Sequence, residues 1–202
     1  MKPSIEEIEF HGIAALRLNG PRGASAVVSK LGAQVLSWVT PDGRERLFLS
    51  DKAVFDSSVA IRGGIPVCWP QFAGLGELPK HGFVRTLPWQ VSAQRGGDDY
   101  ALLTLELADD ATTRALWPHA FRLELTVMLE ADRLDLELSV TNTGDSAFAF
   151  TGALHSYLRH TDLDPQHLQA LDERLAAWLA QARRYKCPPA ELPQLLLSWQ
   201  DR

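Results

Sequence analysis

A strict alternation of apolar and polar residues between positions 121 and 140 is the feature that most limits how this chain can fold. Every second residue is apolar over 121–129 and again over 134–140, and most residues between them are charged or hydroxylated. A period of two is typical of antiparallel strands with one buried face and one solvated face. Ala131-Asp132-Arg133 supplies the turn between the two runs. The sequence therefore predicts a hairpin whose apolar face needs a second layer to cover it.

The rest of the first 160 residues reads as further short strands. Residues 6–18 predict two strands broken at His11-Gly12, and turns such as Pro41-Asp42-Gly43 separate later ones. Further strands are expected at 26–28, 34–39, 88–91, 100–107 and 147–154. Residues 108–118 predict a longer connection with one helical turn. Many short strands with frequent turns indicate a mainly β fold, an antiparallel sandwich.

Bulk composition narrows the class of protein. The 202 residues suffice for one sizeable domain, and the net charge of −5 argues against nucleic-acid or anionic-membrane partners. No apolar run reaches the roughly 18 residues of a membrane span, and the N-terminus does not resemble a secretory signal. Cys68 and Cys187 form neither a disulfide framework nor a metal pattern. A cytoplasmic protein is expected.

The composition changes after Thr161. Residues 162–202 contain no Val, Ile, Thr or Gly, and Asp164-Pro165 reads as a helix N-cap followed by proline at the first position. We expect a β-sandwich over 1–163 and a helical tail over 164–202. An apolar stripe at helical spacing, beginning with Leu168 and Leu171, suggests that the tail covers an exposed sandwich face. Unrelated sequence replacing the end of the sandwich is the open alternative.

Residues 61–85 combine cations with turn-forming residues. Arg62 precedes two glycines, which would let a ligand approach the main chain, and Lys80, His81 and Arg85 lie within six positions. On a regular strand, Lys80 and Arg85 would face opposite sides unless Gly82 bent it, whereas His81 and Arg85 would share a face. A solvated surface loop and a site for a small anionic ligand both fit this pattern.

His155 stands at the end of the last expected strand, in the run from Gly152 to Arg159. A histidine next to an aromatic residue is often structural. Its functional interpretation is general acid–base chemistry, because imidazole titrates near neutral pH.

Three motifs in series carry a family resemblance. They are Arg62-Gly63-Gly64-Ile65-Pro66-Val67-Cys68-Trp69-Pro70, Lys80-His81-Gly82-Phe83-Val84-Arg85 and Phe150-Thr151-Gly152-Ala153-Leu154-His155-Ser156-Tyr157. Together they resemble the hexose-6-phosphate mutarotases (glucose-6-phosphate 1-epimerases), a branch of the aldose 1-epimerase group. The resemblance covers roughly residues 4–163. It implies a β-sandwich of galactose-mutarotase type.

The resemblance also implies an activity and its residues. The family's enzymes are isomerases that interconvert the α and β anomers of the sugar by acid–base ring opening, without a metal or cofactor. His155 matches the acid that protonates the ring oxygen. Arg62, Lys80 and Arg85 match positions that hold the sugar phosphate, which suits planar Arg forks and a Lys point charge. His81 is expected to touch the sugar or to serve a structural role.

The chain also departs from the family pattern. The family's catalytic Glu lies further beyond the histidine than residue 202, and its substrate-contacting Asp has no counterpart in the tail. Glu173 and Glu191 are available carboxylates, but neither has the family's sequence context. The alternatives are therefore a non-catalytic carbohydrate- or sugar-phosphate-binding module, a truncated family member, and a protein that self-associates through an incomplete sandwich edge. An aldose mutarotase without phosphate preference fits less well with three cations.

Overall fold

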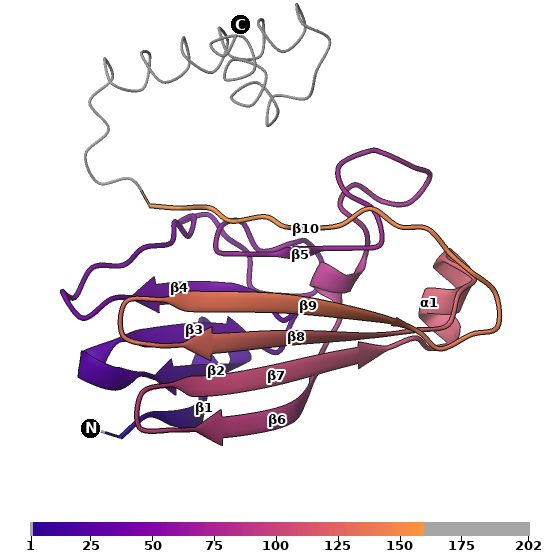
Figure 1. Ribbon diagram of the computed structural model, residues 1–202. Helices are drawn as coiled ribbons and strands as arrows, with labels where there is room; N and C mark the ends of the chain where they lie inside the picture. The colour runs from indigo at the N-terminus through magenta and orange to yellow at the C-terminus, as the bar shows by residue number, and fades with distance from the viewer. Residues whose placement is uncertain (1, 160–202) are drawn as a thin grey trace, which may run out of the picture. The chain divides into compact units, whose positions relative to one another are not determined.

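Residues 2–159, the part of the chain that the computed structural model describes, form two four-stranded antiparallel sheets (Figure 1). The strand orders are β1-β2-β3-β4 and β6-β7-β8-β9, so neighbours in each sheet are consecutive in the chain. A short sheet of β5 and β10 lies along one side of both, and one core joins the three. The predicted antiparallel β-sandwich is confirmed. The strands are β1 (Ser4–Phe10), β2 (Ile13–Asn19), β3 (Ser25–Ser29), β4 (Val35–Val39), β5 (Val67–Cys68), β6 (Gln90–Gly96), β7 (Ala101–Ala108), β8 (Phe121–Leu129), β9 (Leu134–Asn142) and β10 (Ala153–Leu154), with 3-10 turns η1 (Pro21–Gly23) and η2 (Val84–Thr86) and helix α1 (Ala111–Leu116).

The alternating hairpin forms as predicted, but its two strands are buried to different extents. On β8 the apolar residues from Phe121 to Leu129 are completely buried, because β7 and β9 flank it on both sides. On β9, Leu134 and Leu136 are only half-buried and line an apolar groove of about 230 Å³. β9 is an edge strand. Self-association through this edge stays a prediction, which light scattering of the chain in solution would test.

One predicted strand is much shorter than expected. Only Ala153–Leu154 of the segment 147–154 is a strand, and it pairs with β5. Phe148 and Phe150 instead place their rings 6.4 and 5.8 Å from the indole of Trp69. Packing of these rings takes the place of a longer strand ladder.

The connection at 108–118 contains the expected helical turn, and the sequence explains where it starts. The Asp110 side chain accepts a hydrogen bond from the Thr113 backbone N–H, while the Thr113 hydroxyl accepts one from the Asp110 N–H. This reciprocal capping box satisfies donors that the first turn of a helix leaves free. Among residues 2–159 no helix is long and apolar enough to cross a membrane. The predicted tail at 164–202 and the boundary at 163 lie outside the described residues.

Trp69 anchors the region where the three sequence motifs meet. It is fully buried, and its ring centroid lies 4.7 Å from that of Phe121, 5.0 Å from that of Trp117 and 6.5 Å from that of Phe83. Aromatic pairs at such separations contribute about 0.5–1.5 kcal/mol each beyond the area that they bury. The backbone on both sides of Trp69 is thereby held against the core.

Candidate active site

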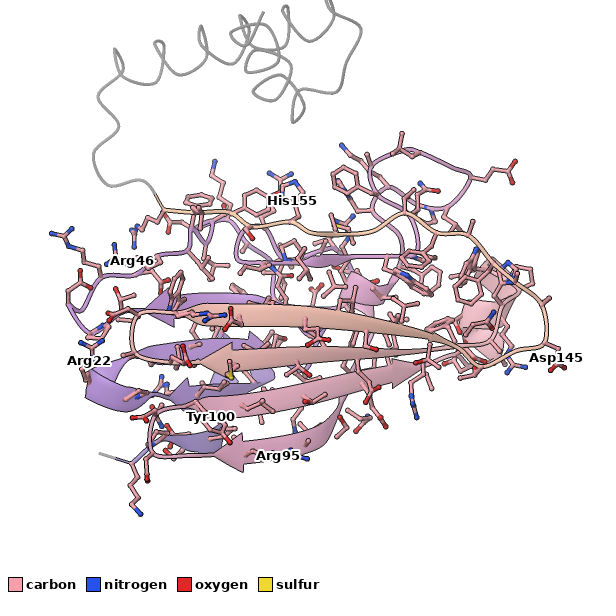
Figure 2. The ribbon with its side chains drawn as sticks, in the orientation of Figure 1. Arg22, Arg46, Arg95, Tyr100, Asp145 and His155 are labelled. Atoms are coloured by element: carbon pink, nitrogen blue, oxygen red, sulfur yellow. The ribbon has the colours of Figure 1, made fainter. Side chains whose placement is uncertain are left out.

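His155 is held by an irregular ladder between the chain around β10 and the chain around β5. The His155 N–H donates to the Pro66 carbonyl at 3.1 Å, and the Tyr157 N–H donates to the Gly64 carbonyl at 2.9 Å. Alternate residues of an extended chain face opposite sides. His155 and Tyr157 therefore share the face opposite Leu154 and Leu158, which line the apolar groove. Figure 2 shows His155 on the β10 side of the molecule, away from the two four-stranded sheets.

His81 reaches the same place through a loop that leaves Trp69 and returns to it. Trp69 and Gly82 form a parallel bridge, and the Phe83 N–H donates to the Trp69 carbonyl at 3.3 Å. Gly82 has a φ of +70°, and a Cβ there would lie 2.0 Å from the Trp69 carbonyl oxygen. Only glycine permits this close approach. The segment 80–85 is thus a turn followed by η2, so the face rule for a regular strand does not apply to Lys80, His81 and Arg85.

Four aromatic rings come together where the loop meets the β10 chain. The ring of His155 stacks on Tyr157 at 4.6 Å between centroids, with an interplanar angle of 19°. The ring of His81 stands edge-on to that of His155 at 5.8 Å. Phe72 lies 5.2 Å from His81 and 6.2 Å from His155. Two imidazoles therefore meet beside apolar ring surface, an arrangement suited to binding a sugar and exchanging protons with it.

Two of the three predicted cations belong to this cluster. Arg85 is half-buried, and one N–H of its guanidinium donates to the Lys80 carbonyl at 2.6 Å. A guanidinium has five N–H donors, so others stay free for an anion. Arg62 is exposed on the chain leading to β5. The structure brings Lys80, His81, Arg85 and His155 together, whereas Arg62 shares no hydrogen bond with them and is not among the charges that act on the pKa of His81.

The cations also act on His81. Burial lowers the pKa of His81, and the nearby charges of Arg85, Lys80 and His155 lower it further. The imidazole consequently stays neutral at pH values where a free histidine, with a pKa of about 6.5, begins to take up a proton. Since the unfolded chain binds this proton more tightly, His81 destabilises the fold as the pH falls below about 6.5.

This electrostatic coupling predicts the titration of His81. Arg85→Gln removes a positive charge near the ring, so the pKa of His81 should rise toward its ordinary value, although burial keeps it lowered. Histidine ring NMR signals recorded against pH measure this directly. Arg95→Gln, on exposed β6 far from His155 (Figure 2), is the matched control and should leave the titration unchanged. An unchanged titration in Arg85→Gln would show that the guanidinium does not act on His81.

Comparison with known proteins gives the family. The aldose 1-epimerase family model matches residues 14–176, more than half of the chain. This chain belongs to the aldose 1-epimerase family. It is 39% identical over 145 residues to a Salmonella typhimurium protein named "Putative glucose-6-phosphate 1-epimerase", covering 71% of this chain and 48% of that protein. A protein of the same name from Cenchrus ciliaris is 35% identical over 170 residues, covering 80% of this chain and 51% of its own length.

Solved structures of mutarotase-like proteins share the fold of this chain. The crystal structure of a Salmonella typhimurium protein titled "putative mutarotase" superposes with a TM-score of 0.69 at 34% identity, covering 78% of this chain and 52% of that one. A galactose mutarotase-like protein from Clostridium acetobutylicum shares the fold, with a TM-score of 0.58 at 19% identity, covering 70% of this chain and 49% of its own. This aldose 1-epimerase family chain therefore spans about half the length of the curated relatives that it matches.

The structure adds residues to the candidate site of this aldose 1-epimerase family member. Phe72, Gln71 and Tyr157 were not predicted from the sequence. The two-residue spacing of Tyr157 from His155 was the available signal for the tyrosine, whereas nothing local marked the other two. A cavity of about 620 Å³ lies elsewhere, near His11 and Phe55, and contains none of the predicted site residues. Within residues 2–159 no group of three or more His, Cys, Asp or Glu is arranged to hold a metal.

Proposed function

We propose that this chain provides the acid and the phosphate-binding residues of a hexose-6-phosphate mutarotase. The observation that carries the proposal is the meeting of His155 with His81 beside Lys80 and Arg85. Membership of the aldose 1-epimerase family and the names of its relatives support the same reaction and substrate class.

The reaction needs one proton donor and one proton acceptor. In our proposal His155 protonates the ring oxygen while a base removes the proton from the anomeric hydroxyl, so the C1–O5 bond breaks as the C1 carbonyl forms. Rotation about C1–C2 and the reverse proton transfers close the other anomer. An imidazole can serve as the acid and recover its proton on ring closure. We assign no residue among 2–159 as this base.

The phosphate group accounts for the two cations near the histidines. A charge-assisted hydrogen bond contributes about 1.5–3 kcal/mol, so Lys80 and Arg85 together provide a substantial part of the affinity for a small polar substrate. Arg62 is proposed as a third phosphate ligand by its place in the family motif. The lowered pKa of His81 keeps its ring neutral, so the ring contacts the sugar as a hydrogen-bonding group rather than as a further cation.

Exchange between the anomers of glucose 6-phosphate tests the proposal. Exchange NMR with and without the folded chain should show faster interconversion, and the acceleration should be weaker for glucose, which lacks the phosphate. Saturable binding without acceleration would instead identify a sugar-phosphate-binding module. Absence of both in a folded sample would overturn the proposal.

A further inference from the structure

Two hydrogen bonds join Ala73 and His81 across the loop that carries the histidine. The His81 N–H donates to the Ala73 carbonyl at 3.0 Å, and the Ala73 N–H donates to Nδ1 of the His81 ring at 3.2 Å. A ring nitrogen that accepts a hydrogen bond carries no proton, so the proton of the neutral ring is on Nε2. Within residues 2–159 no hydrogen bond to Nε2 is present, which leaves this N–H available to a ligand.

These two hydrogen bonds depend on an unusual backbone conformation at both residues. Ala73 and His81 both have positive φ angles, +51° and +68°, which residues with a Cβ rarely adopt. Such conformations persist only where the surrounding structure holds them. The loop therefore needs a support other than its own local preference.

Gln71 is that support. Its side chain is 4% exposed, and its Nε2 donates to the Ala73 carbonyl at 3.2 Å and to the Leu78 carbonyl at 3.0 Å. Its Oε1 accepts from the Leu78 N–H at 3.0 Å. One buried amide thus closes the loop at both ends and shares the Ala73 carbonyl with the backbone of His81.

We propose that Gln71 is a positioning residue that, by closing the 71–81 loop, holds His81 in the tautomer with its proton on Nε2 so that the ring donates a hydrogen bond to an oxygen of the bound sugar. Gln71 itself does not touch the substrate. The sugar contact rests on the proposed function, whereas the tautomer is a property of the ligand-free chain and is tested without substrate.

Gly76 provides a second way to disturb the same amide. A Cβ on Gly76 would lie 2.4 Å from Oε1 of Gln71, whereas a Cβ on Gly74 in the same loop would meet nothing within 4 Å. Gly76→Ala should therefore displace the amide, and Gly74→Ala is its matched control. Gln71→Met removes all three hydrogen bonds, Gln71→Glu removes only the donors, and Gln94→Met on exposed β6 is the control for both.

The experiment is ¹⁵N NMR of the histidine rings in the ligand-free chain. In the wild type, Nδ1 of His81 should show the shift of an unprotonated nitrogen and Nε2 that of a protonated one. In Gln71→Met, Gln71→Glu and Gly76→Ala these shifts should move toward a mixture of tautomers, while the His155 signals and both controls stay as in the wild type. Wild-type His81 shifts in the three variants would overturn the proposal, as would a wild-type ring with its proton on Nδ1.

A titration with glucose 6-phosphate tests the proposed hydrogen bond from His81 to the sugar. Loss of one neutral hydrogen bond predicts a dissociation constant raised about threefold to tenfold in Gln71→Met, with no change in the controls. Altered tautomers with unchanged affinity would overturn the sugar contact but not the positioning of the ring. If the wild type binds no sugar phosphate, the proposed function fails, and the ring shifts still decide the role of Gln71. If Gln71→Met does not fold, the ring shifts of Gln71→Glu and Gly76→Ala decide whether Gln71 positions His81.

Discussion

Replacing His155 with Asn is expected to slow anomer exchange of glucose 6-phosphate about 100-fold to 10,000-fold, the usual contribution of a positioned general acid. The amide keeps a polar side chain against Tyr157 but cannot deliver a proton to the ring oxygen. Its backbone bond to Pro66 is unaffected, so the fold should survive. Substrate affinity should change much less than the exchange rate, because the cations of the loop remain.

His11→Asn is the matched control for this substitution. His11 is exposed at the β1–β2 turn with a φ of +50°, which Asn tolerates well. It stacks on Phe55, outside the candidate site. Exchange NMR should give the wild-type rate for His11→Asn. A wild-type rate for His155→Asn would contradict the role of His155 as the acid.

Gly82→Ala is expected to lower the free energy of unfolding by about 3 kcal/mol or more, a large effect for one methyl group. The positive φ alone costs about 1–2 kcal/mol in a residue with a Cβ. The added Cβ would also lie 2.0 Å from the carbonyl oxygen of Trp69, whose buried ring prevents the backbone from retreating. Urea denaturation followed by tryptophan fluorescence measures the loss.

Gly43→Ala separates strain from collision. Gly43 also has a positive φ, +77°, but a Cβ there would meet nothing within 4 Å. Its cost should be the strain alone, about 1–2 kcal/mol. Equal losses for Gly43→Ala and Gly82→Ala would show that the close approach of Gly82 to Trp69 does not limit the fold.

The sequence predicts most strands of this fold because their periodicity is local. The alternation from Phe121 to Leu129 and the break at His11-Gly12 are visible without any knowledge of distant contacts, and both match the structure. The segment 147–154 differs because Phe148 and Phe150 pack against Trp69, about 80 residues earlier. Periodicity cannot reveal such a long-range contact.

The candidate site likewise contains residues that can be recognised from the sequence and residues whose role depends on the folded loop. Lys80, His81, Arg85 and His155 are chemically distinctive, so they stand out in the sequence. Gln71 is a common polar residue, and its importance arises only from the closure of the loop around its amide.

A titration of the chain with glucose 6-phosphate, followed through the histidine ring NMR signals, tests whether the loop and the β10 chain form a hexose-phosphate site. The signals of His81 and His155 should shift together and saturate at one dissociation constant, while those of His11 and His119 stay unchanged. Glucose should produce much weaker shifts. Shifts confined to His11 or His119, or no saturable shift at His81 and His155 in a folded sample, would contradict a hexose-phosphate site at this meeting of the loop and the β10 chain.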